Sequence, residues 1–163
     1  MWLAQREQSR SELRRKLMHV ARRAAGVGDA ADARDADGAG EALAEMTAAV
    51  EAVLDALEAG DLLSEQRFVD ARVRSRQPRF GARRIQQELQ QHGVQLRPDQ
   101  LQALRSSEWQ RASELWQRRF ARTASDPRER ARQARFLLAR GFSAEVVRRV
   151  VAGQLAPASD GDG

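Results

Sequence analysis

The sequence predicts an all-α protein made of three tandem three-helix modules that form an elongated array. A basic helical stretch that ends in glycine and an apolar residue occurs twice, at 81–94 (GARRIQQELQQHGV) and at 128–142 (RERARQARFLLARGF). The two glycines are 48 positions apart, and a related stretch without its glycine lies at 9–20. A unit that recurs at such a period is typical of stacked helical modules. No segment has the alternation of polar and apolar residues that predicts strands.

The first module is predicted to span residues 1–60. Its expected helices are 2–8, 9–24 and 41–59. Ser9 and Glu12 fit a capping box at the start of the second helix, and Gly60 is expected to end the third in the left-handed conformation. Residues 26–40 are mostly small and acidic, which predicts a mobile insertion loop between these helices.

The second module is predicted at 61–106 and the third at 107–153, followed by a disordered tail at 154–163. Their helices are expected to start near Ser64, Gly81, Pro98, Ser107, Asp126 and Ser143. Gly93 and Gly141 are expected to end two of them.

Each module is too small to bury a large core alone, so neighbouring modules are expected to share one. The residues assigned to these shared cores are Phe68, Trp109, Trp116, Phe120 and Phe136. Their helical spacing explains them better than a cofactor-binding role does.

Charge is unevenly distributed along the chain. Residues 1–28 have a net charge of +5, residues 29–61 have −9, and residues 62–153 have +11. Such segregation attracts a polyanion or an acidic protein surface. Only one of the 28 basic residues is lysine, and about half of the arginine excess is assigned to the codon bias of a GC-rich genome.

Eight arginines form the predicted partner-binding surface, because a planar guanidinium suits a carboxylate or a phosphate. They are Arg72, Arg76, Arg79, Arg83, Arg84, Arg128, Arg132 and Arg135. The first three are spaced i, i+4, i+7, as are the last three, so each set would share one face of a continuous helix. For any single arginine, the alternative is a solvated helical face.

No motif predicts an enzyme, since the phosphate-binding glycine loops, HExxH and a Ser/His/Asp set are all absent from the sequence. The lack of cysteine excludes disulfides and thiolate metal sites. The two histidines are 73 positions apart and predict no metal site, and no cofactor is expected. With no signal-peptide core and no apolar run of about 18 residues, we expect a cytoplasmic monomer without a membrane span.

Several stretches, among them DLLSEQRFVDARVRSR and RARQARFLLARGFSAEVV, resemble the RecX family of regulatory proteins. The resemblance covers nearly the whole chain and is most specific at 81–93 and at 136–142. The chain departs from the family pattern in its acidic insertion and in lacking a glycine after the first basic stretch. The resemblance implies a bacterial, non-catalytic modulator of RecA recombinase whose three-helix modules form an elongated, curved array. It would bind the RecA–single-stranded DNA filament and inhibit ATP hydrolysis and strand exchange.

A second hypothesis follows from the residues alone. Three helices with a basic face resemble a helix-turn-helix unit, and the basic block suits contacts to phosphates. The chain would then bind nucleic acid directly and act independently of RecA.

Overall fold

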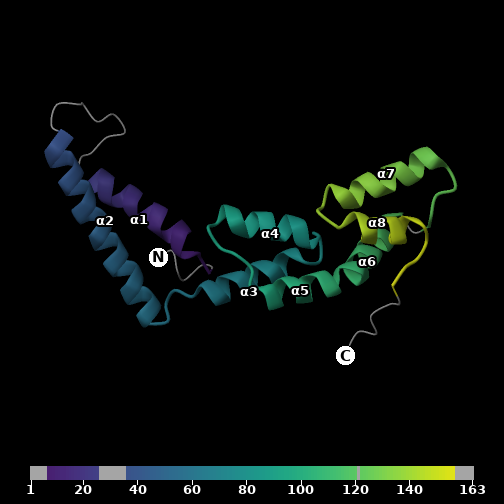
Figure 1. Ribbon diagram of the computed structural model, residues 1–163, viewed down its shortest axis with the longest axis horizontal. Coiled ribbons are helices and arrows are strands. Elements are labelled where there is room, and N and C mark those ends of the chain that lie inside the picture. Colours follow the sequence, from purple (N-terminus) through teal and green to yellow (C-terminus); the bar gives the residue numbers. More distant parts are fainter. Residues whose placement is uncertain (1–6, 26–35, 121, 157–163) are drawn as a thin grey trace. The chain divides into compact units, whose positions relative to one another are not determined.

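The computed structural model describes residues 7–25, 36–120 and 122–156, which form eight helices and no strand (Figure 1). The helices are α1 (Arg10–Ala24), α2 (Ala36–Ala59), α3 (Glu65–Arg76), α4 (Ala82–Gln91), α5 (Pro98–Ser106), α6 (Glu108–Phe120), α7 (Pro127–Leu138) and α8 (Ala144–Val151). The all-α prediction is confirmed for this part of the chain. Within these ranges, none of the helices combines the length and the hydropathy that a membrane crossing requires.

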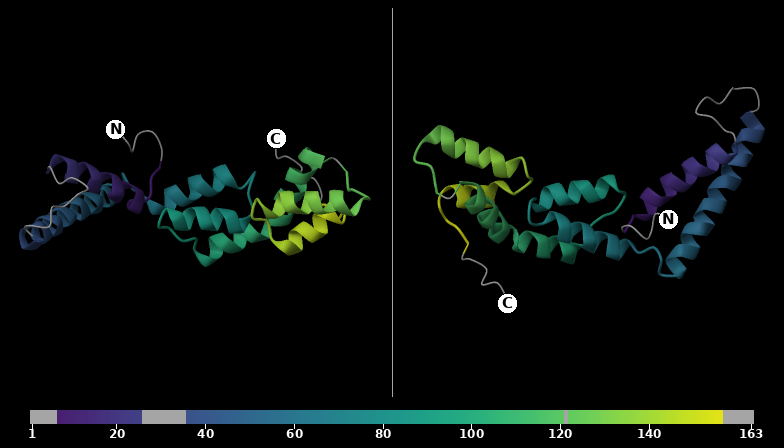
Figure 2. Two further views of the ribbon diagram at one scale, coloured as in Figure 1. Left: turned by 90° about the horizontal axis from the view of Figure 1, so that it is seen from above. Right: turned by 180° about the vertical axis from the view of Figure 1, so that it is seen from behind.

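The chain forms two compact units, Met1–Phe68 and Val69–Gly163, and the boundary between them falls inside α3. In the first unit, α1 lies alongside α2 as a helical hairpin (Figure 2). Its core consists of Leu13, Val50, Leu54 and Leu63. Ser9 caps α1 as predicted, because its hydroxyl oxygen accepts a hydrogen bond from the backbone N–H of Glu12 at 3.1 Å.

Two boundaries predicted for the first module are wrong. The expected helix 2–8 lies mostly outside the described residues, and Glu7 and Gln8 are not helical. Ser9 has the extended backbone of an N-cap (φ −77°, ψ 154°), which interrupts any helix before α1. The expected loop 26–40 is too long, since α2 already begins at Ala36; residues 26–35 lie outside the described ranges. A glycine inside a helix costs about 1 kcal/mol, which a helix of this length tolerates.

The end of α2 also differs from the prediction. The left-handed residue is Asp61 (φ 53°), not Gly60. The N–H of Asp61 donates to the carbonyl oxygen of Glu58 at 3.0 Å, and that of Leu62 donates to Leu57 at 2.9 Å, which is the Schellman pattern. Aspartate tolerates this conformation better than most residues with a side chain, so composition alone pointed to the wrong residue.

The glycine that ends each basic stretch has the predicted role. Gly93 (φ 73°) and Gly141 (φ 80°) are left-handed and end α4 and α7. The next residue, Val94 or Phe142, donates its N–H to a carbonyl oxygen five residues earlier and is at most 3% exposed. The recurring glycine–apolar pair is therefore a Schellman end whose apolar residue returns to the core.

One core of the second unit lies among α6, α7 and α8. It contains Trp116 and Leu137 as well as Phe142, and three aromatic residues pack against its edge: Trp109, Phe120 and Phe136. Four of the five aromatic residues assigned to shared cores thus belong to one core formed by three consecutive helices. The fifth, Phe68, is 3% exposed.

Candidate partner-binding surface

Two glycines bring the start of α4 against the turn between α7 and α8. The N–H of Gly81 donates to the carbonyl oxygen of Arg140 at 3.0 Å. A Cβ at Gly81 would overlap the carbonyl group of Gly141, and a Cβ at Gly141 would lie 2.5 Å from the Cβ of Arg84. Only glycine permits such a close approach of two backbones. Gly81, which begins the first repeated stretch, and Gly141, which ends the second, therefore join α4 to the α7–α8 turn.

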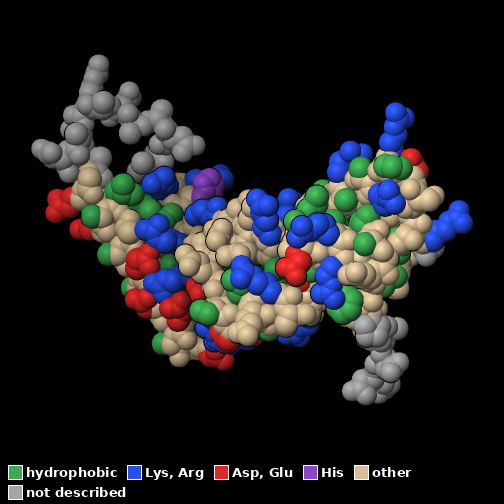
Figure 3. Space-filling model, turned by 45° about the vertical axis from the view of Figure 1, so that its right-hand side comes forward, with side chains coloured by type: hydrophobic (Ala, Val, Ile, Leu, Met, Phe, Trp, Pro, Cys, Tyr) green, Lys and Arg blue, Asp and Glu red, His purple; other side chains and the backbone are tan. Residues whose placement is uncertain are grey.

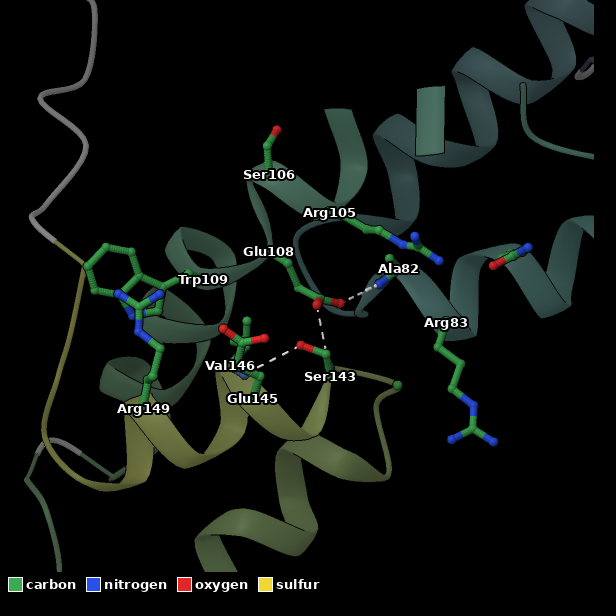
Figure 4. A pocket seen from close by; sticks show the side chains of 12 residues that line it. Ala82, Arg83, Arg105, Ser106, Glu108, Trp109, Ser143, Glu145, Val146 and Arg149 are labelled. Atoms are coloured by element: carbon green, nitrogen blue, oxygen red, sulfur yellow. Dashed lines mark hydrogen bonds between the residues drawn. The ribbon is translucent and has the colours of Figure 1, made fainter. Parts of the chain in front are cut away.

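Glu108 stabilises the same contact. It is the first residue of α6, and only 4% of it is exposed. Its carboxylate accepts a hydrogen bond from the N–H of Ala82 at 2.8 Å and another from that of Ser143 at 3.4 Å (Figure 4). Ala82 begins α4 and Ser143 is the N-cap of α8, so one negative charge stabilises the positive ends of two helices.

Arg111, also in α6, binds backbone carbonyl groups of the neighbouring segments. Its guanidinium donates to the carbonyl oxygens of Gln77 (2.9 Å), Phe80 (2.6 Å) and Leu104 (2.7 Å). Burial of this side chain lowers the pKa of Arg111, although the charge of Glu108 opposes the effect. The start of α6 therefore contacts the segment before α4 and the end of α5 through buried charged groups, whereas its aromatic side chains pack against α7 and α8.

Two of the predicted surface arginines are engaged with an acidic neighbour. Nη1 of Arg72 lies 3.4 Å from Oε1 of Glu88, and Nε of Arg76 donates to the same oxygen at 2.9 Å. Nη2 of Arg72 lies 2.8 Å from Nε2 of His92, and because a guanidinium has no acceptor, the ring nitrogen must accept. The side chain of Arg72 is 17% exposed. Through these contacts, both arginines hold α3 against α4.

Arg79 does not share a helical face with Arg72 and Arg76, contrary to the prediction. Helix α3 ends at Arg76, and Arg79 lies in the turn that follows. Pro78 explains the break, because proline disfavours a helical backbone in the residue before it. Arg79, Arg83 and Arg84 are exposed, and no carboxylate in the described part of the chain pairs with them.

The three predicted arginines of α7 lie on one continuous helix and are exposed. Arg132 donates to Oε1 of Glu129 through Nε (3.1 Å) and Nη2 (2.8 Å), and this hydrogen bonding raises the pKa of Arg132. Arg128 and Arg135 have no carboxylate partner among the described residues. The unpaired predicted arginines thus come from α4, α7 and the turn before α4.

The two units differ in charge. The first carries nine basic and thirteen acidic residues, a net charge of −4, and the second carries nineteen basic and ten acidic residues, a net charge of +9. On the face shown in Figure 3, acidic and basic side chains alternate over the first unit, whereas arginine predominates over the second. A phosphate or carboxylate surface is therefore attracted mainly to the second unit.

A cavity of about 620 Å³ lies in the second unit beside Glu108. Arginines from three helices line it: Arg83 of α4, Arg105 of α5 and Arg149 of α8 (Figure 4). The guanidinium carbon of Arg149 lies 4.0 Å from the centroid of the Trp109 ring, and Nε1 of Trp109 donates to the carbonyl oxygen of Gln154 at 3.0 Å.

Sequence reasoning missed the buried charges and two of the cavity arginines. A signal existed for Glu108, since it precedes Ala112 and Trp116 at four-residue spacing and so continues the buried stripe of α6 by one turn. No comparable signal marks Arg105 or Arg149, because their contacts depend on how the helices meet.

Comparisons with known proteins find similarity to a single family. A model described as the RecX second three-helix domain matches residues 64–95, and one described as the RecX third three-helix domain matches residues 106–151. Proteins named regulatory protein RecX from Leptothrix cholodnii, Ralstonia nicotianae and Chromobacterium violaceum are 45%, 41% and 37% identical to this chain. The alignments cover 92%, 99% and 93% of this chain and 82%, 88% and 84% of those proteins. No solved structure matches.

Proposed function

This chain belongs to the RecX family of regulatory proteins, and from that premise we propose that it restrains RecA recombinase by binding along the RecA–single-stranded DNA filament. Bound there, it inhibits ATP hydrolysis and strand exchange. The observation that carries the proposal is the concentration of exposed arginine on the second unit, whose net charge is +9. A nucleoprotein filament presents both phosphates and carboxylates, which are the groups that a guanidinium binds best.

The exposed arginines are the proposed contacts with the filament: Arg79, Arg83, Arg84, Arg128 and Arg135. Arg132 contributes once it exchanges Glu129 for an acceptor on the partner. Arg72 and Arg76 support the surface indirectly, since their contacts with Glu88 fix α3 relative to α4.

The direct test is the rate of ATP hydrolysis by RecA on single-stranded DNA, titrated with this protein. We expect the rate to fall with increasing protein, and we expect the half-inhibitory concentration to rise with salt because exposed charges are screened. An unchanged rate at saturating protein would contradict the proposal.

The rival function, direct nucleic-acid binding without RecA, rests on the same charge of the second unit. Binding to naked single-stranded DNA, to RecA alone and to RecA-coated DNA separates the two functions. The proposed function requires the coated strand to bind most tightly. Equal affinity for naked and coated DNA, falling steeply with salt, would favour the rival.

A further inference from the structure

We propose that the cavity beside Glu108 is a nucleotide subsite. A base lies beside the Trp109–Arg149 pair, and its flanking phosphates contact Arg83 and Arg105. The inference deepens the proposed function and rests on it, since the single strand of the filament is the source of the nucleotide. It assigns a recognition role to Arg105, Trp109 and Arg149, none of which belongs to the partner-binding surface predicted from the sequence.

One end of the cavity provides a stacking surface. The guanidinium of Arg149 lies over the indole of Trp109 at 4.0 Å, and the hydrogen bond from Trp109 to Gln154 fixes the ring. Aromatic rings and guanidinium planes are the surfaces on which proteins stack unpaired bases. Because the pair is already assembled, little side-chain ordering remains to oppose binding.

The other end of the cavity suits phosphate. Figure 4 shows Arg83 and Arg105 reaching from α4 and α5 on the side away from the Trp109–Arg149 pair. Both arginines are exposed, and no described carboxylate pairs with them. Glu108, the buried acid beside them, is directed at the backbone N–H groups of Ala82 and Ser143.

The acidic residue on the cavity wall sets the orientation of the nucleotide. Glu145 lies one helical turn before Arg149 on α8 and is exposed. Its carboxylate offsets the positive charge of Arg149 at the Trp109 end, so the phosphates are directed to Arg83 and Arg105 and the base to the stacked pair. An acidic peptide would use the arginines but leave the stacking surface empty, which favours a nucleotide. The volume of about 620 Å³ is in the range of small-ligand cavities.

Tryptophan fluorescence tests the proposal in a Trp2→Phe background, which serves as the parent. Of the two remaining tryptophans, Trp109 lines the cavity whereas Trp116 is buried in the core. Oligothymidylate of about ten nucleotides, within the length that a compact binding site covers, should change the fluorescence of the parent protein. The Trp109→Phe variant should not show this change. Arg149→Ala should weaken binding about tenfold, as expected for loss of a stacking surface. The double variant Arg83→Ala/Arg105→Ala should lower the slope of log affinity against log salt by about 1.4, or about 0.7 for each phosphate contact.

Matched controls separate the cavity from the general charge of the protein. Arg148→Ala removes an exposed charge next to Arg149, and Arg22→Ala/Arg23→Ala removes two exposed charges from α1. Both controls should bind the oligonucleotide nearly as the parent does. Circular dichroism establishes that each variant retains its helices.

Binding of different ligands separates a nucleotide subsite from a site for an acidic peptide. If thymidine monophosphate alone gives the Trp109 signal with the same arginine dependence, the subsite is supported and a free nucleotide is its source. If polyglutamate gives that signal, or if oligothymidylate binds without any effect from Trp109 or Arg149, the subsite is overturned. A protein that inhibits RecA while Trp109 fails to respond would overturn this inference and leave the proposed function standing.

Discussion

The arginines that join helices have different partners in the two units. In the first unit, Arg10 of α1 donates to three carboxylates of α2, those of Glu51, Asp55 and Glu58, at 2.6–2.7 Å. Arg14 donates to Glu51 as well. These arginines hold a hairpin with a small core together, and their charge is already compensated.

In the second unit, several arginines contact groups that leave their charge in place. Arg111 donates to carbonyl oxygens, Arg140 lies 3.8 Å from the ring centroid of Phe136, and Arg149 covers Trp109. Others, such as Arg83, have no acidic partner among the described residues. An arginine that pairs with a carboxylate of the same chain has its charge compensated. The pairing of the arginines, rather than their number, therefore decides whether a basic surface remains available to a partner.

The largest loss of stability is expected from Gly141→Ala, which destabilises the second unit and leaves the first unchanged. The left-handed backbone and the overlap with Arg84 together cost about 3 kcal/mol. In a Trp2→Phe background, urea unfolding followed by tryptophan fluorescence measures the loss, because Trp109 and Trp116 both belong to the second unit. Gly40→Ala in α2 is the matched control: nothing lies within 4 Å of its Cβ, so this change should stabilise the helix by about 0.5–1 kcal/mol. Equal midpoints for the two variants would contradict the close approach.

A smaller loss is expected from Glu108→Gln. The glutamine keeps one acceptor oxygen, but its amide group faces a backbone N–H that then lacks an acceptor, at a cost of about 2 kcal/mol. Thermal unfolding of this variant beside Glu145→Gln, an exposed acid of α8, isolates the contribution of the buried carboxylate. A similar midpoint for both variants would show that Glu108 does not join the two helices.

The smallest effect is expected in how the stability of the first unit depends on pH. Hydrogen bonds from Arg10, and secondarily from Arg14, hold the pKa of Glu51 below its ordinary value of 4.5. A carboxyl whose pKa is lowered by folding stabilises the folded state above its ordinary pKa and loses that contribution as pH falls through the lowered value. Arg10→Ala should therefore reduce stability slightly at pH 7 and have no effect near pH 2. An equal effect at both values would rule out the ion pairs as its cause.

The sequence predicted those parts of the fold that local chemistry determines. Ser9 and Asp126 cap their helices, and Gly93 and Gly141 end theirs, because each of these residues satisfies backbone groups within a few positions. The left-handed role given to Gly60 was wrong because aspartate next to it also adopts that conformation. The division into three modules stays a prediction.

The candidate site was less predictable, because it depends on contacts between helices. Spacing identified Arg128, Arg132 and Arg135 as one face of α7, but the engagement of Arg72 with Glu88 and His92 requires α3 and α4 to be placed together. Similarly, the meeting of Arg149 with Trp109 joins residues 40 positions apart. Periodicity within one helix carries no information about such pairs.

The most direct test of the central claim compares inhibition of RecA by two variants that each lose three exposed arginines. One is Arg79→Ala/Arg83→Ala/Arg84→Ala in the second unit, and the other is Arg15→Ala/Arg22→Ala/Arg23→Ala in α1. The measured quantity is the concentration that halves ATP hydrolysis on single-stranded DNA. It should rise about tenfold for the first variant, as expected if each exposed contact contributes about 0.5 kcal/mol, and should change little for the second. An equal or larger rise for the α1 variant would contradict the account.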